Sequence, residues 1–290
     1  MNLFVFGAGY SGRAIAAELA DKITWGGGTT RSDINAPLLS AVGLETFIFD
    51  GKEISQPVRH ALKDVTHLIK SIAPHEGGDP LLNLVDGDLK ALMPNLQWSA
   101  YLSTVGVYGD HQGAWVDEET VCKPVSKRSI WRRRAEEQWQ AAAEQSGVPC
   151  AILRLSGIYG PGRNRFINIE KGTARRLVKP GQVFNRIHVD DIAGATAHLL
   201  ERGEGGLWNV TDNLPAPPQD VITYSCELMG VEPPPEIDFE TADLTPMARS
   251  FYGENKRVSN KKLRDSGYIL KAPDYKSALA AMWQEDNWRG

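Results

Sequence analysis

The sequence has few cysteines and no excess of basic residues. Its 290 residues include Cys122, Cys150 and Cys226, with no Cys-x-x-Cys pair, so neither a disulfide framework nor a zinc site is indicated. Lysine and arginine number 32 against 36 acids, a net charge of −4, which disfavours nucleic acid as a partner because phosphate binding needs positive charge. Reduced thiols in the cytoplasm are the expectation.

Long apolar runs are also missing. A membrane-spanning helix needs about 18 or more consecutive apolar residues, and no segment approaches that length. The apolar start, MNLFVFGAGYSGRAIAAELA, lacks the basic residues that open a secretory signal and is interrupted by three glycines. The sequence therefore predicts no membrane partner.

Short apolar segments alternate with helical ones, which is typical of βαβ units around a parallel sheet. A further strand is expected within residues 19–25, with the glycines at 26–28 in a loop beside it. Beyond residue 210, prolines favour loops or extended structure and indicate a smaller lobe. The apolar segments expected to form strands are LFVF (3–6), ETFIF (45–49), THLIKSIA (66–73), WSAYLS (98–103) and CAILRL (150–155). The predicted fold class is α/β, with a Rossmann-type doubly wound parallel sheet and a smaller C-terminal substrate lobe.

A glycine-rich motif follows the first predicted strand. Gly7, Gly9 and Gly12 form Gly-x-Gly-x-x-Gly directly before a helical segment. In this setting the first glycine permits a tight turn, the second lets a pyrophosphate approach the backbone, and the third allows close helix packing. We interpret the motif as a dinucleotide site that includes Tyr10 and Ser11, with a plain glycine-rich turn as the alternative.

Residues near the end of the second strand should set the choice of cofactor. An acid about 20 residues past the motif would bind the adenosine ribose of NAD, whereas arginine suits the extra phosphate of NADP. Arg31 lies 31 − 12 = 19 residues past Gly12, and no acid occurs between Asp21 and Asp33. Arg31 and Ser32 are therefore predicted to bind NADP, with NAD as the second choice. A solvated loop arginine is the alternative.

Four further segments resemble the NAD(P)-dependent epimerase/dehydratase family, the extended short-chain dehydrogenase/reductases. They are YLSTVGVYGD (101–110), ILRLSGIYGPGR (152–163), NRIHVDDIAGA (185–195) and GLWNVTD (206–212). Their order and spacing match the family across most of the chain, although the family usually spaces its glycines Gly-x-x-Gly-x-x-Gly, so an atypical branch is indicated. The resemblance implies a Rossmann domain over residues 1–155, completed by about 185–205, and a substrate lobe over 156–184 and 206–290.

The resemblance also implies roles for single residues. Asp50 would lie near the adenine, and Ser71 and Ala73 would line the cofactor after the fourth strand. Thr104, four residues before Tyr108, would occupy the catalytic Ser/Thr position. For Asp50 and Ser71, ordinary turn chemistry is the alternative interpretation.

The family's catalytic Tyr-x-x-x-Lys helix corresponds here to SKRSIWRRRAEEQW, which contains no tyrosine. Aligning Ala135-Glu136 with the family's Ala-Glu pair places Arg128 in the Tyr slot and Arg132 in the Lys slot. Shifting the alignment by one residue places Ser129 and Arg133 there instead. In the family a tyrosine phenol exchanges a proton with the substrate, and neither alignment supplies it.

Arginine cannot replace that phenol, because a pKa above about 12 keeps it protonated, but it can stabilise negative charge. Thr104, Arg128 and Arg132 are therefore the candidate catalytic residues, with a structural helix face as the alternative. Two functions remain open. One is an oxidoreductase or epimerase/dehydratase acting on a sugar-nucleotide or other small polar substrate; the other is a non-catalytic dinucleotide-binding redox sensor or partner-binding module.

Other polar residues have weaker interpretations. Arg154, Arg163 and Arg186 suit an anionic substrate or surface salt bridges. Tyr108 and Tyr159 are candidates for a replacement acid, although packing is the stronger interpretation.

In the segment HVDD at 188–191, Asp190 or Asp191 is expected to cap a helix. No metal-ligand spacing occurs. The expected partner is a small molecule, and a homo-oligomer is compatible with the sequence.

Overall fold

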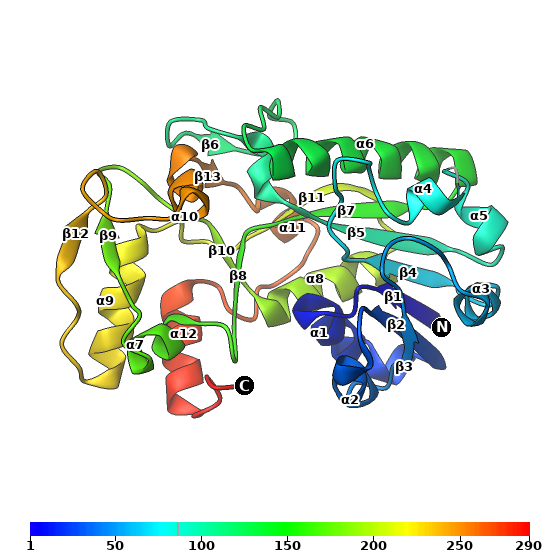
Figure 1. Ribbon diagram of the computed structural model, residues 1–290, viewed down its shortest axis with the longest axis horizontal. Coiled ribbons are helices and arrows are strands. Elements are labelled where there is room, and N and C mark those ends of the chain that lie inside the picture. The colour runs from blue at the N-terminus through cyan, green and yellow to red at the C-terminus, as the bar shows by residue number, and fades with distance from the viewer. Residues whose placement is uncertain (86) are drawn as a thin grey trace. The chain divides into compact units, whose positions relative to one another are not determined.

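A seven-stranded sheet forms the centre of the computed structural model, which describes residues 1–85 and 87–290. Its strand order is β11-β7-β5-β4-β1-β2-β3, and the pairs formed by β1 to β5 are parallel (Figure 1). The strands are β1 (Asn2–Phe6), β2 (Trp25–Thr30), β3 (Glu45–Ile48), β4 (His67–Lys70), β5 (Trp98–Thr104), β7 (Cys150–Leu155) and β11 (Gly206–Val210). The chain runs outward from β1 in both directions, which is doubly wound topology. The predicted α/β fold class is confirmed.

The five apolar segments predicted as strands are β1, β3, β4, β5 and β7. The second strand was predicted wrongly, because β2 contains the glycines that were expected in a loop. Close packing explains them: a Cβ on Gly26 would lie 2.8 Å from Leu44 Cδ2, and one on Gly27 would lie 2.6 Å from the Trp25 ring. Glycine within a strand here marks the close approach of neighbouring side chains.

The described residues form two compact units. Unit 1 comprises Met1–Val107, Lys127–Arg154 and Ile192–Trp208; unit 2 comprises Tyr108–Ser126, Leu155–Asp191 and Asn209–Gly290. The predicted limits, which give residues 1–155 and about 185–205 to the Rossmann domain and residues 156–184 and 206–290 to the substrate lobe, divide the chain differently. They stay a prediction.

Helices cover both faces of the unit 1 sheet (Figure 1). They are α1 (Tyr10–Glu18), α2 (Ala36–Ser40), α3 (Gln56–Leu62), α4 (Leu82–Val85), α5 (Leu89–Leu92), α6 (Lys127–Ser146) and most of α8 (Val189–Glu201), with short 3₁₀ turns η1 (Ala20–Lys22), η2 (Asp33–Asn35) and η3 (Val105–Tyr108). The core between α6 and the sheet contains Tyr101 and Trp139, whose rings stack with centroids 5.8 Å apart. This contact fixes α6 against β5, the strand that ends at Thr104.

Unit 2 is built from short paired strands and helices. Its strands are β6 (Trp115–Val116), β8 (Gly157–Tyr159), β9 (Arg176–Val178), β10 (Arg186–His188), β12 (Glu236–Asp238) and β13 (Arg257–Val258), paired as β8–β10, β9–β12 and β6–β13. Its helices are α7 (Arg165–Glu170), α9 (Pro218–Met229), α10 (Pro246–Ser250), η4 (Phe251–Gly253), α11 (Lys261–Asp265) and α12 (Tyr275–Gln284).

The proline-rich stretch after residue 210 includes a helix that the sequence did not lead us to expect. Helix α9 begins at Pro218, because proline is well tolerated in the first turn, where its missing N–H leaves no bond unmade. Within the part of the chain described here, no helix combines the length and the apolar character needed to cross a membrane.

Candidate functional site

The turn between β1 and α1 needs two of its three motif glycines for steric reasons. Gly7 has φ +84°, a conformation that favours glycine, and its N–H donates to Thr29 Oγ1 at 2.8 Å. A Cβ on Gly7 would lie 2.8 Å from Ile72 Cγ1, and one on Gly12 would lie 2.9 Å from Val5 Cγ1. The packing of unit 1 therefore requires glycine at both positions.

Gly9 differs, because the described protein leaves room for a side chain there. The nearest atom to a Cβ on Gly9 would be Gly7 O at 3.9 Å, an ordinary contact. Gly9 is the N-cap of α1, whose first turn contains no acid and receives no side-chain cap among the described residues. The first-turn N–H groups, which include those of Tyr10 and Ser11, thus form the kind of helix N-terminus that binds anions.

The predicted adenosine-side residues follow β2 and β3. Arg31 is exposed directly after β2, and Ser32 Oγ accepts from the N–H of Ile34 at 3.3 Å. Asp50 Oδ1 accepts from Lys52 N at 3.0 Å, and its other carboxylate oxygen lies 3.7 Å from Lys52 Nζ. The turn chemistry proposed as the alternative for Asp50 is present, and the cofactor contacts of these residues stay predictions.

The segment after β4 lies beside the glycine turn. Ser71 N donates to Phe6 O at 2.8 Å, which prolongs the pairing of β4 with β1. The backbone carbon of Ser71 would be 3.5 Å from a Cβ on Gly7. The structure therefore brings together the glycine motif and Ser71, which were predicted separately, while Ala73 is exposed in the loop that follows.

Thr104 lies at the end of β5, next to the start of α6. Its Oγ1 accepts from Gly106 N at 3.1 Å. A Cβ on Gly106 would lie 3.4 Å from Thr104 Oγ1 and 3.0 Å from Ser129 Oγ, so the two hydroxyls flank the same stretch of backbone. Ser129 is buried and Arg128 is exposed. Of the two alignments of this helix, the one with Ser129 in the Tyr slot places a side chain beside Thr104.

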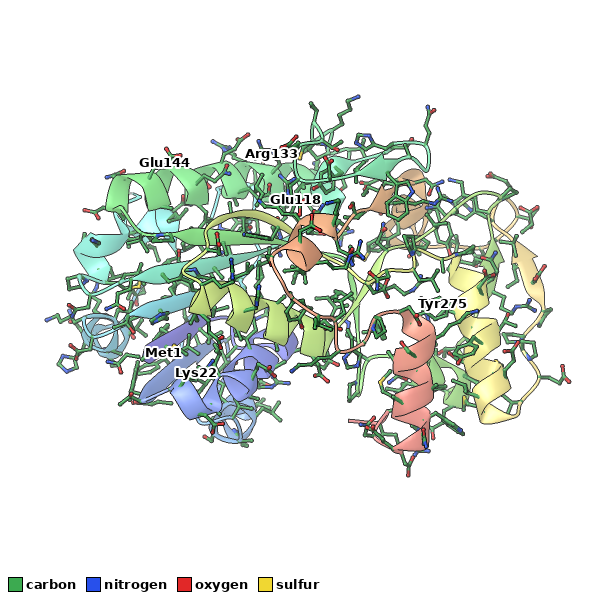
Figure 2. All side chains as sticks on the ribbon, turned by 180° about the vertical axis from the view of Figure 1, so that it is seen from behind. Met1, Lys22, Glu118, Arg133, Glu144 and Tyr275 are labelled. Carbon is green, nitrogen blue, oxygen red and sulfur yellow. The ribbon has the colours of Figure 1, made fainter. Side chains whose placement is uncertain are left out.

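The next two arginines of α6 make contacts within unit 1. Arg132 Nη1 donates to Leu102 O at 2.5 Å and to the Tyr101 hydroxyl at 3.4 Å. Arg133, seen on α6 in Figure 2, has Nη2 3.1 Å from Glu137 Oε1 and Nη1 3.6 Å from Glu136 Oε2. Arg132 is thus held at the carboxyl end of β5, and Arg133 forms ion pairs with acids of its own helix.

A buried ion pair lies beneath these residues. Glu136 accepts from Arg154 Nε at 3.1 Å and from Arg154 Nη2 at 2.8 Å, and Ser103 Oγ donates to the same carboxylate at 2.6 Å. Arg154 is only 1% exposed. Both interpretations of Arg154 from the sequence, an anion contact and a surface salt bridge, are therefore wrong. Sequence reasoning missed this pair because its partners are 18 residues apart and neither belongs to a recognisable spacing.

The two tyrosines considered as replacement acids are buried in unit 2. The Tyr108 hydroxyl donates to Asn209 Oδ1 at 2.8 Å. The Tyr159 ring packs edge-on against His188 with centroids 5.3 Å apart, and burial raises the pKa of Tyr159 above its usual value. A phenol with a raised pKa is a poor acid at neutral pH, so the geometry supports packing roles.

Asp191 does not cap α8, which corrects one of the two assignments considered. Its Oδ1 accepts from Lys271 N at 2.7 Å and from the Tyr268 hydroxyl at 2.9 Å, and its Oδ2 accepts from Ala272 N at 2.9 Å. These hydrogen bonds therefore hold residues 268–272, which precede α12, against Asp191 within unit 2. The backbone N–H of Asp190 instead donates to His188 Nδ1 at 3.3 Å.

Arg186 is also occupied within unit 2, whereas Arg163 is exposed. Arg186 Nη1 donates to Phe184 O at 2.9 Å and to Ala216 O at 3.1 Å. Burial lowers the pKa of Arg186 to about 10. Among the described residues, no group of three or more His, Cys, Asp and Glu side chains is placed to hold a metal ion.

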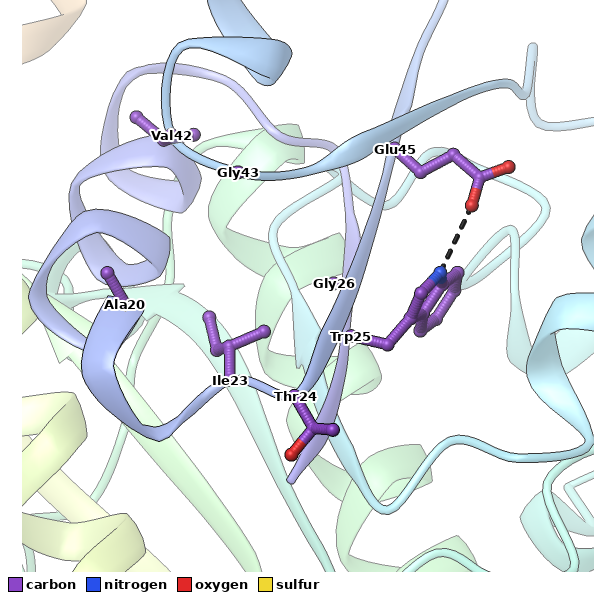
Figure 3. A pocket seen from close by; sticks show the side chains of 8 residues that line it. All are labelled: Ala20, Ile23, Thr24, Trp25, Gly26, Val42, Gly43 and Glu45. Atoms are coloured by element: carbon purple, nitrogen blue, oxygen red, sulfur yellow. Dashed lines mark hydrogen bonds between the residues drawn. The ribbon is translucent and has the colours of Figure 1, made fainter.

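A pocket in unit 1 lies elsewhere (Figure 3). Its lining residues are Ala20, Ile23, Thr24, Trp25, Gly26, Val42, Gly43 and Glu45. Trp25 Nε1 donates to Glu45 Oε2 at 3.1 Å across its edge. These residues lie at the amino ends of β2 and β3, whereas open α/β sheets bind ligands at the carboxyl ends of the strands. The pocket is therefore separate from the candidate site.

The fold and the glycine turn together define an α/β protein with the architecture of dinucleotide-binding proteins, and comparison with known proteins agrees. Residues 91–211 match the model of the NAD dependent epimerase/dehydratase family. A functionally unknown conserved protein from Silicibacter pomeroyi DSS is 45% identical, with a TM-score of 0.88 over 98% of this chain and 99% of that one.

A putative NAD-dependent epimerase/dehydratase from Methylobacillus flagellatus is 28% identical, with a TM-score of 0.73 over 98% of each chain. Protein YeeZ from Escherichia coli strain K12 is 28% identical over 254 residues, which are 79% of this chain and 84% of that protein. The family model and the Methylobacillus flagellatus structure together support membership of the chain in the NAD-dependent epimerase/dehydratase family.

Proposed function

We propose that the chain binds a nicotinamide dinucleotide at the carboxyl edge of the unit 1 sheet. The observation that supports this most directly is Gly9, where the described protein leaves open space and φ is −78°. Nothing in the described part of the fold calls for glycine at this position. A pyrophosphate seated on the N-terminus of α1 does, since it must approach the backbone closely.

NADP is the proposed form of the cofactor. Arg31 is exposed directly after β2, where the ribose phosphate of NADP is recognised in this fold class. Its planar guanidinium can donate two hydrogen bonds to one phosphate group, and Ser32 offers a hydroxyl beside it. Asp33 is the nearest following acid, and it lies beyond the position at which an NAD-binding acid would be expected.

For the reaction, we propose oxidoreduction or epimerisation of a small polar, anionic substrate at the end of β5. The Thr104 hydroxyl would donate a hydrogen bond to a substrate oxygen there. Arg132, held at the Leu102 carbonyl, would stabilise developing negative charge. Arg128, exposed one turn earlier on α6, is a contact for the substrate.

Dinucleotide binding without turnover is the second candidate, and the structure of α6 favours it. In the alignment that puts Ser129 in the Tyr slot, the Ser129 hydroxyl, which lies beside Thr104, would stand in for the family's tyrosine. An aliphatic hydroxyl transfers a proton poorly at neutral pH unless a neighbouring base activates it. Such a protein would report the state of the cofactor pool or bind a partner in response to it.

Calorimetric titration with NADPH tests the cofactor site. Gly9→Val should abolish binding, because a branched side chain would stand where the pyrophosphate must approach. Circular dichroism and the melting temperature should stay near those of the wild type, since the fold leaves room for the side chain. Gly253→Ala, at a unit 2 glycine where an added Cβ would have no atom within 4 Å, is the matched control. Tight binding by a folded Gly9→Val variant would refute the site.

The same titrations with NADH test the preference for NADP. The wild type should bind NADPH about tenfold or more tightly than NADH, because losing a charged phosphate contact costs about 1.5 to 3 kcal/mol. Arg31→Ala should narrow this gap, and Arg59→Ala, at an exposed arginine of α3, should leave it unchanged. Equal affinities of the wild type for both dinucleotides would rule out the preference.

A further inference from the structure

Strand β4 ends in a lysine whose side chain is completely buried. Lys70 is 0% exposed, its ammonium donates to Ile72 O at 2.7 Å, and it forms an ion pair with Asp79. Lysine is among the residues least often buried in this way. Both contacts are with the loop that follows β4: Ile72 lies two residues after Lys70, and Asp79 lies nine residues after it.

The carboxylate of Asp79 is bound on every side. Its Oδ1 accepts from Leu81 N at 2.9 Å and from Leu82 N at 3.2 Å, at the start of α4. Its Oδ2 accepts from Trp139 Nε1 at 3.1 Å, which connects it to α6. The Lys70–Asp79 pair therefore anchors the loop after β4 to two helices of unit 1.

Tyr101 and Arg132 complete the surroundings of the lysine. Lys70 Nζ lies 5.4 Å from the centroid of the Tyr101 ring, and Arg132 Cζ lies 5.7 Å from the same centroid. Burial lowers the pKa of Lys70 to about 8, with Asp79 opposing the shift and Arg132 adding to it. Burial also raises the pKa of Tyr101 well above its usual value.

The anchored loop forms one wall of the glycine turn. Ile72 lies directly against Gly7, since a Cβ there would come within 2.8 Å of Ile72 Cγ1. Strand β2 lies on one side of β1 and β4 on the other. With the pyrophosphate on α1 and the adenosine directed towards the end of β2, the nicotinamide half of the dinucleotide must extend over the end of β4.

We propose that Lys70, through its ion pair with Asp79 and its bond to the Ile72 carbonyl, is a positioning residue for the nicotinamide half of the cofactor. This inference rests on the proposed dinucleotide function. The pair fixes the positions of Ser71 and Ile72 next to Gly7. Without the pair, the adenosine half would keep its contacts at α1 and the end of β2. The nicotinamide half would lose its contacts, because Ser71 and Ile72 would be displaced.

Titrations with NADPH and with 2′,5′-ADP, which carries the adenosine half alone, separate the two halves. The variants are Lys70→Met and Lys70→Met/Asp79→Asn; the double variant leaves no unpaired charge buried and is the one to use if the single variant does not fold. Lys63→Met, at an exposed lysine of unit 1, controls for the loss of one charge. We expect the Kd for NADPH to rise about tenfold or more and the Kd for 2′,5′-ADP to stay within about twofold.

A second measurement uses the wild type alone. Since burial lowers the pKa of Lys70 to about 8, its ammonium should lose its proton as the pH rises from 7 to 9.5, and the ion pair with Asp79 should be lost with it. The ratio of NADPH affinity to 2′,5′-ADP affinity should therefore fall severalfold. A constant ratio, an equal loss for both ligands in the variants, or unchanged NADPH binding would overturn the positioning role. A wild type that binds neither ligand would instead refute the dinucleotide site itself.

Discussion

Asp212 is a buried carboxylate in unit 2 whose ionisation opposes folding. It is 2% exposed, its Oδ1 accepts from Leu214 N at 3.1 Å, and its Oδ2 has no hydrogen-bond partner among the described residues. Arg186 favours the charged form, while Asp274 and Asp191 disfavour it. Burial is the dominant effect and raises the pKa of Asp212 from 3.8 to about 7.

This raised pKa predicts how stability changes with pH. Between about pH 4 and 7 the folded protein keeps a proton that the unfolded chain releases. The contribution of Asp212 to the unfolding free energy therefore falls as pH rises through this window, and above pH 7 the full cost is present. Asp212→Asn should add about 2 to 3 kcal/mol more to the stability at pH 8 than at pH 5.

Urea unfolding of both proteins at the two pH values measures this difference. Asp243→Asn, at an exposed aspartate of unit 2, should show no such pH dependence. If the stability difference between Asp212→Asn and the wild type were the same at pH 5 and pH 8, the carboxylate would titrate normally in the folded protein.

Single residues also show where sequence reasoning stops. The Gly7–Gly12 turn could be predicted because its three glycines have a fixed spacing and follow a strand. The glycines of β2 were misplaced, since glycine usually weakens a strand, and the crowding by Leu44 and Trp25 exists only in the folded protein. The pairs Lys70–Asp79 and Glu136–Arg154 left no signal in the sequence, because burial of a charge depends on packing between distant segments.

At the scale of elements, strands were predicted better than helix faces. Strands buried on both faces tend to be mainly apolar, and β1, β5 and β7, which are almost wholly buried, have that composition. Helix α6 has polar residues on its buried side, including Ser129 and Glu136. The sequence alone therefore could not decide which residue of this helix faces Thr104.

The orientation of α6 predicts which restored motif would function. Ser129→Tyr/Arg133→Lys places a phenol beside Thr104, whereas Arg128→Tyr/Arg132→Lys places it on the exposed side. Since a positioned general acid contributes about 10²- to 10⁴-fold, the first double variant should exceed the wild type at least about tenfold in NADPH oxidation. The assay is a panel of carbonyl and sugar-nucleotide substrates, with NADPH titration and circular dichroism to verify folding.

The second double variant is the comparison and should show no gain over the wild type, because Arg128 is exposed and a phenol there would not lie beside Thr104. A gain in the Arg128→Tyr/Arg132→Lys variant alone would show that the other alignment is the functional one. Strong turnover by the wild type that is lost in Tyr108→Phe or Tyr159→Phe would place the acid outside α6 and exclude the binding-only candidate.

At the scale of the molecule, the chain passes between the two units five times, after residues 107, 126, 154, 191 and 208. Unit 1 is therefore not a continuous stretch of sequence. Its sheet includes β11 beside β7, and the indole N–H of Trp98 donates to Glu204 O at 2.9 Å. Residues near position 200 thus complete a core that begins at residue 2.

This connectivity predicts that a fragment of residues 1–155 does not fold by itself. Removing residues 192–208 would leave one edge of β7 unpaired and would expose Trp98, which is 2% exposed in the 290-residue chain. Burying a large side chain contributes about 1.5 to 3 kcal/mol. This is a large part of a domain's marginal stability. The fragment should show a weak near-ultraviolet circular dichroism signal, no cooperative unfolding in urea and no binding of NADPH. The 290-residue chain, measured in parallel, should show a strong near-ultraviolet signal, cooperative unfolding in urea and binding of NADPH. Cooperative unfolding together with NADPH binding by the fragment would show that α8 and β11 are dispensable, and that the dinucleotide site is specified entirely by the first half of the sequence.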